Sequence, residues 1–122
     1  MEPELSETGE MMARILPDSR EGNTFAAAEG DYIIMGTVGN GVCITIYRDL
    51  PGTPTLPMMA RMNALNSGMG GGAHSIVAGR EKSLYRFRAT CPDERDEFSL
   101  RRFVLVAKTE AAQGYQYIVK GV

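Results

Sequence analysis

The chain contains few of the residues from which metal sites, disulfide scaffolds and nucleophilic active sites are built. Its 122 residues include two cysteines, one histidine and no tryptophan. Cys43 and Cys91 form no Cys-x-x-Cys pair, and with His74 they are too few to close a tetrahedral zinc shell. Both cysteines lie in apolar, strand-like runs, which predicts inert core thiols. A chain of this length buries about two-thirds of its unfolded surface without cross-links, so we expect no metal and no disulfide.

Strong charge and long apolar runs are also missing. The formal net charge is −2, which argues against a general nucleic-acid binder, because such domains are usually basic. No apolar run has the length of a membrane span. Residues 1–5 lack the basic and apolar regions of a signal peptide. The sequence therefore predicts a soluble cytoplasmic protein with no membrane span and no nucleic-acid partner.

Two clusters resemble ligand-binding motifs but have simpler explanations. The glycine-rich run at 68–72 follows a predicted helix, opens a strand and contains no lysine, whereas a P-loop follows a strand and opens a helix with Gly-Lys-Ser/Thr. The carboxylates at 93–97 precede the last predicted helix, where negative charge favours the helix dipole. His74 has no spacing relation to either cysteine, so no thiol–histidine pair is expected. We therefore expect a protein that is not an enzyme and has no cofactor.

Hydrophobic periodicity predicts an α+β fold with elements in the order αβββαββα. The predicted helices cover about 5–16, then 56–67 behind a Thr55 cap, and a final stretch from Asp96 or Asp93 towards Gly121. The predicted strands are 24–28, 32–38, 42–48, 73–78 and 83–91, and 18–23 is predicted to be a turn. Gly114 weakens the last helix by about 1 kcal/mol relative to alanine, which allows a break there. The pattern predicts one domain over 1–122, with helices packed against an antiparallel sheet.

The register of the first long hairpin follows from how side chains sort between the two faces. A three-residue loop at 39–41, with Gly41 at positive φ, places Val38 opposite Val42 and Ile34 opposite Ile46. The aliphatic side chains then share one face. A two-residue turn would mix threonine and tyrosine into the apolar row, so we predict the three-residue loop.

Side chains alternate along 83–91. Tyr85 and Phe87 share one predicted face, and Arg86 and Arg88 share the other, facing water or a partner. Base stacking and phosphate contacts could not then use one surface, which argues against an RNA-binding strand.

The chain contains eight methionines, and three of them, Met58, Met59 and Met62, lie in the predicted middle helix. Methionine fills irregular gaps in cores, and it also forms adaptable binding surfaces. Both interpretations stay open. With Leu65, these residues give the helix more apolar surface than a single sheet covers, which predicts a homodimer through this helix.

The order of elements resembles that of the class I type III secretion chaperones and the chaperone-like folds around them. The resemblance spans nearly the whole chain. Its most telling stretches are Met59-Ala-Arg-Met-Asn-Ala-Leu-Asn66, before a glycine-containing link and a hairpin, and Gly114-Tyr-Gln-Tyr117 near the end of the last helix. The family has no invariant motif, so the resemblance is one of architecture.

This resemblance implies a non-enzymatic homodimer that binds the N-terminal segment of a secreted effector protein and keeps it secretion-competent. The implied dimer contacts are Met58, Met62 and Leu65. The implied client contacts are Leu5, Met12, Phe25 and Ile33. The alternative is a regulatory or sensory domain of the same fold that binds a folded protein or a small ligand.

Overall fold

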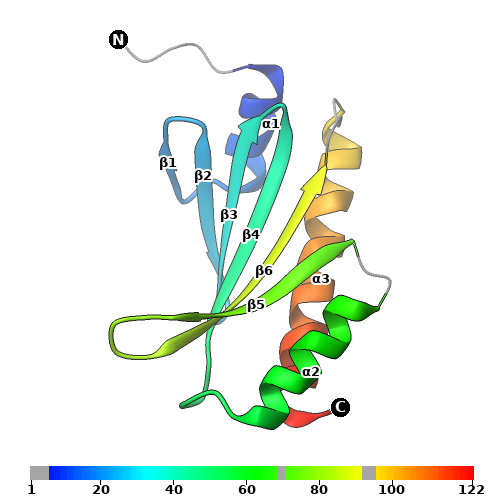
Figure 1. Cartoon of the computed structure of the whole chain (residues 1–122). Helices are drawn as coiled ribbons and strands as arrows, with labels where there is room; N and C mark the ends of the chain where they lie inside the picture. The colour runs from blue at the N-terminus through cyan, green and yellow to red at the C-terminus, as the bar shows by residue number, and fades with distance from the viewer. Residues whose placement is uncertain (1–5, 69–70, 92–95) are drawn as a thin grey trace.

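Helices and strands cover most of residues 6–68, 71–91 and 96–122, the parts of the chain that the computed structural model describes. The elements are α1 (Glu7–Ile15), β1 (Ser19–Glu21), β2 (Thr24–Glu29), β3 (Tyr32–Gly39), β4 (Gly41–Asp49), α2 (Leu56–Ser67), β5 (Gly72–Ala78), β6 (Ser83–Cys91) and α3 (Glu97–Lys120). The predicted α+β class and order of elements are confirmed, with one strand added (Figure 1).

The added strand, β1, was predicted to be a turn. It has three residues, all of them exposed, so it has no alternation of apolar and polar side chains. The strand forms through backbone pairing with the edge of β2, in a register that places Arg20 opposite Phe25. The sheet is antiparallel throughout, with the strand order β1-β2-β3-β4-β6-β5.

The register predicted for the β3–β4 hairpin is confirmed. Val38 lies opposite Val42, and Ile34 lies opposite Ile46. Gly41 has a φ of +132°, a backbone conformation that β-branched residues rarely adopt. The positive φ is therefore confirmed, and the aliphatic side chains share the buried face as the sorting argument required.

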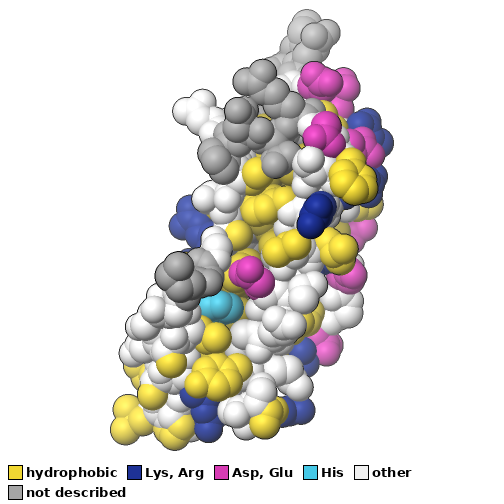
Figure 2. All heavy atoms as spheres, turned by 90° about the vertical axis from the view of Figure 1, so that its right-hand side faces the viewer, with side chains coloured by type: hydrophobic (Ala, Val, Ile, Leu, Met, Phe, Trp, Pro, Cys, Tyr) yellow, Lys and Arg dark blue, Asp and Glu magenta, His cyan; other side chains and the backbone are white. Residues whose placement is uncertain are grey.

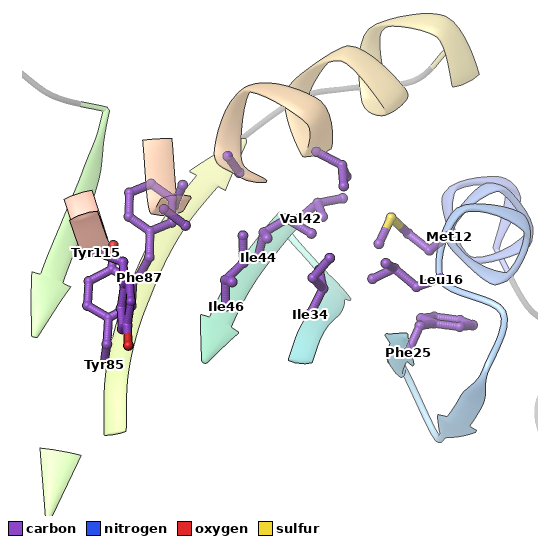
Figure 3. Close-up of a cluster of buried hydrophobic side chains, with 14 of the residues drawn as sticks. Met12, Leu16, Phe25, Ile34, Val42, Ile44, Ile46, Tyr85, Phe87 and Tyr115 are labelled. Carbon is purple, nitrogen blue, oxygen red and sulfur yellow. The ribbon is translucent and has the colours of Figure 1, made fainter. Parts of the chain in front are cut away.

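The core lies between the sheet and the helices α1 and α3. Figure 3 shows Ile34, Ile44 and Ile46 pointing from β3 and β4 to the side on which α3 lies, while Met12 reaches inward from α1. All four are at most 1% exposed. At Gly36 on β3 a side chain would collide with Met12 and Leu16, so this glycine lets α1 approach the sheet closely.

The helix ends follow the predicted caps. The Thr55 hydroxyl accepts a hydrogen bond from the Met58 amide at 3.3 Å, and α2 ends before Gly68. Asp96 caps α3 through the Ser99 amide at 2.9 Å, and Gly121 closes that helix in the left-handed conformation. No break occurs at Gly114. Among the described helices, none has the length and apolar character needed to cross a bilayer.

Candidate functional site

One face of the sheet carries no helix among the described residues, and we call it the open face. It presents the strand positions that alternate with the core positions. Ile33, 47% exposed, lies opposite Tyr47 on β4 and Ala28 on β2. Met35 lies two residues further along β3 and opposite Ala26. These five side chains form one contiguous group, the apolar patch, which is the kind of surface that partners cover.

Two arginines border the apolar patch. Arg86 lies opposite Tyr47, and Arg88 lies opposite Thr45. The Arg86 Nε donates to the Ser75 Oγ at 3.1 Å, and the Arg88 Nε donates to the Cys43 sulfur at 3.4 Å. Neither arginine forms an ion pair with any residue that the structure describes. The open face is therefore locally positive in a chain whose net charge is −2.

The alternation predicted along β6 is confirmed, but the sequence did not predict that Tyr47 of β4 lies beside Arg86. Tyr85 and Phe87 are fully buried on the helix side. Tyr47 lies on the open face opposite Arg86, and only the strand order could place it there. The prediction of core thiols is wrong for both cysteines, because each is only half-buried. Cys43 lies on the open face, where it accepts the hydrogen bond from Arg88, and Cys91 is the last residue of β6.

The three residues implied in a dimer contact differ in how deeply they are buried. Met58 is only 7% exposed and belongs to the core, while Met62 and Leu65 are half-buried against it. The outward face of α2 instead carries Leu56, 81% exposed, and Met59, 45% exposed. Met58 is therefore not available to a second subunit, whereas Met62 and Leu65 keep part of their surface exposed.

The implied client contacts are also divided. Met12 and Phe25 are 0% and 1% exposed, so they hold the core together and offer nothing to a client in this conformation. Ile33 is exposed on the open face. Leu5 lies outside the described residues. Helical and strand periodicity identified the apolar positions correctly but could not tell which of them the fold covers.

His74 has a partner that spacing did not predict. Its Nδ1 lies 2.7 Å from the hydroxyl oxygen of Tyr85, and the ring packs against Phe87 with centroids 5.1 Å apart. Gly114 on α3 makes room for this pair, because a Cβ there would overlap the imidazole and lie 3.0 Å from the Tyr85 hydroxyl. Burial lowers the pKa of His74 and raises that of Tyr85, so both are neutral near pH 7.

The tautomer of His74 follows from the need of the buried Tyr85 hydroxyl for a hydrogen-bond acceptor. Tyr85 is fully buried, and its hydroxyl contacts no acceptor other than His74 among the described residues. Donation from Tyr85 to Nδ1 satisfies the buried hydroxyl proton, whereas the reverse orientation would leave that proton without an acceptor. The ring proton therefore sits on Nε2.

A hollow of about 450 Å³ between α2 and α3 is lined by His74 together with Glu110, Gln113 and Tyr117. Figure 2 shows histidine atoms at this surface, next to an acidic side chain. The arrangement supplies an imidazole, a carboxylate and a phenol hydroxyl as hydrogen-bonding groups. Among the described residues, no three side chains of the metal-binding types His, Cys, Asp and Glu come together.

A side chain of α2 occupies one position on the outer edge of strand β5. The Asn66 amide group accepts from the backbone N–H of His74 at 2.8 Å and donates to its carbonyl at 2.6 Å. Arg61 donates to the carbonyl of Ile118 at 3.1 Å, near the end of α3. These contacts fix α2 against the edge strand and the last helix.

No family model matches the chain, and no curated protein matches it either. Among solved structures, YbjN from E. coli, described as a candidate transcription regulator, superposes with a TM-score of 0.68. The two chains share a fold. The match covers 94% of this chain and 90% of YbjN, at 11% sequence identity. At that identity the likeness extends to the fold alone.

Proposed function

We propose that this chain is a non-enzymatic protein-binding module that holds an extended segment of another protein against the open face of its sheet. The observation that carries the proposal is the apolar patch bordered by Arg86 and Arg88. Successive side chains of an extended segment alternate in direction and lie close to a flat sheet. A segment rich in apolar and acidic residues would cover the patch and supply the carboxylates that the two arginines lack.

The sheet edges favour binding on the face over addition of a strand. The backbone of His74 on β5 is already bonded to Asn66. The opposite edge is the three-residue β1, in which Arg20 and Glu21 are exposed, and short, charged edges discourage strand pairing. The client segment therefore lies across the strands and does not extend the sheet.

This activity agrees with the type III secretion chaperones that the architecture resembles. In that setting the client is the N-terminal segment of a secreted effector, and the module is a cytoplasmic homodimer that keeps this segment unfolded. The outward face of α2 supplies a dimer surface. Leu56, Met59, Ala60 and Asn63 are exposed there, none of them is charged, and a two-fold axis would bring the same face of each subunit together.

The test uses two unstructured peptides that differ only in charge. One alternates leucine with glutamate and the other alternates leucine with lysine, and binding is measured by fluorescence anisotropy. We expect the acidic peptide to bind and the basic peptide not to bind. Arg86→Glu with Arg88→Glu should weaken binding at least about tenfold, because charged groups then repel across the contact. Arg80→Glu, in the exposed turn before β6, is the matched control and should bind as the wild type does.

Equal binding of the two peptides would contradict the proposal, and so would full binding by the double arginine variant. A single-stranded oligonucleotide is the third probe, because Tyr47 beside Arg86 could stack on a base. Tighter binding of the oligonucleotide than of the acidic peptide would show that the open face is a nucleic-acid surface and would overturn the proposal.

The alternative is a regulatory or sensory domain of the same fold. YbjN, whose fold this chain shares, is described as a candidate transcription regulator. A binding site for a small ligand is the specific feature that would favour this alternative.

A further inference from the structure

A cavity of about 240 Å³ lies between α3 and the middle of the sheet, on the side opposite the open face. Its inner wall is formed by Ile34 on β3 and Ile46 on β4, each 1% exposed, and by Ala112 on α3. An engineered apolar cavity of about 150 Å³ is enough to bind benzene. The cavity therefore has room for one aromatic ring with a short substituent.

Tyr32 forms the side wall of the cavity, and the hydroxyl of Tyr32 already has a hydrogen-bond partner outside the cavity lining. The guanidinium of Arg48 lies 5.1 Å from the centroid of the Tyr32 ring and donates to its hydroxyl at 3.3 Å. The same guanidinium stacks on Tyr115 at 4.2 Å. The ring is thus held in place before any ligand arrives, and its apolar surface is what the cavity meets. An apolar ligand would displace little well-bonded water from such a site.

Two of the residues that line the cavity form an ion pair. The Lys108 Nζ lies 2.8 Å from the Glu29 Oε2. The side chain of Lys108 is 31% exposed, whereas that of Glu29, at the end of β2, is 61% exposed. The lysine therefore belongs to the wall, and the glutamate is the partner that moves more easily into water.

We propose that this cavity binds a small carboxylic acid with a compact apolar body, such as an arylacetate. The ring lies against Ile34, Ile46 and Ala112. The carboxylate takes the place of Glu29 on Lys108, which keeps the lysine paired. A neutral ligand of the same shape would break the ion pair without replacing it, so the anion binds more tightly. Because the site and the open face lie on opposite sides of the sheet, this inference does not rest on the proposed protein-binding activity.

The experiment titrates the ¹⁵N-labelled chain with phenylacetate and, separately, with phenylacetamide, and follows the amide resonances of Gly30 and Ala112. We expect saturable shifts for phenylacetate and about tenfold weaker binding of the amide, since a charge-assisted hydrogen bond is lost. Lys108→Gln should remove that preference. Glu29→Gln should strengthen phenylacetate binding, because the competing carboxylate is gone.

Ala112→Leu fills the cavity and should abolish binding, while Ala60→Leu, the same change on the exposed face of α2, should leave it intact. The Lys108 and Glu29 variants change partly exposed side chains, so they keep the test decisive if Ala112→Leu fails to fold. Three results would each overturn the proposal: no saturable shift at millimolar phenylacetate, equal binding of acid and amide, or unchanged binding by Lys108→Gln.

Discussion

Replacing Gly114 by alanine tests whether the packing of α3 on the His74–Tyr85 pair stabilises the fold. Helix propensity alone predicts that this change stabilises the protein, since glycine in a helix interior is about 1 kcal/mol less favourable than alanine. The tertiary structure predicts the opposite sign. The new Cβ would overlap the imidazole, 2.6 Å from its Nδ1 and 3.0 Å from the Tyr85 hydroxyl.

The magnitude follows from two unfavourable effects. Overfilling a packed site costs about 1–3 kcal/mol. If the imidazole moves to make room, the buried hydroxyl of Tyr85 loses its partner, and an unsatisfied buried polar group costs about 1–3 kcal/mol. Set against the gain in helix propensity, these effects predict a loss of about 1–5 kcal/mol in the free energy of unfolding.

Urea denaturation followed by far-ultraviolet circular dichroism measures this loss. The control is the same Gly114→Ala change in a His74→Ala background, where the imidazole that would overlap the new Cβ is absent. There it should stabilise the protein by up to about 1 kcal/mol, so the sign reverses between backgrounds. Stabilisation by Gly114→Ala in the wild type, or equal effects in both backgrounds, would refute the packing argument.

Three further predictions concern the turn, the histidine and α2. Gly41→Val should lower the free energy of unfolding by about 1–2 kcal/mol, because a φ of +132° is strained for valine; an unchanged urea midpoint would contradict this. Burial lowers the pKa of His74, so as the pH falls below about 6.5 only the unfolded chain takes up a proton there and stability decreases. His74→Leu should reduce this pH dependence, and an equally steep dependence would show that other groups cause it. Leu56→Glu with Met59→Glu should convert a dimer to a folded monomer in sedimentation; a wild type that is already monomeric at tens of micromolar rules the dimer out.

Some features of the fold could be predicted because their causes lie within a few residues of each other in the chain. Thr55 and Gly68 bound α2, since a cap acts on the amide or carbonyl groups of a single helix turn. Asp96 begins α3 for the same reason. The register of β3 on β4 followed from the alternation of aliphatic side chains on two strands joined by a short loop.

The candidate sites could be predicted only in part. Ile33, Met12 and Phe25 were all expected to contact a client; Ile33 is exposed, but Met12 and Phe25 lie in the core. Apolar residues at helical or strand spacing identify the apolar face of an element, but the sequence does not show which apolar faces pack against each other in the fold. The position of Cys43 was mistaken for the same reason, since its strand is covered on one side and open on the other.

The sequence by itself determined the class of the fold, the helix ends, the hairpin register and the absence of any local catalytic motif. The tertiary structure decided the strand order, which brings Tyr47 beside Arg86, and the approach of α3, which brings Gly114 onto His74. These contacts join residues about 40 positions apart in the chain. Local propensities act over one turn or one hairpin, whereas such contacts depend on how the whole set of apolar faces is buried at once.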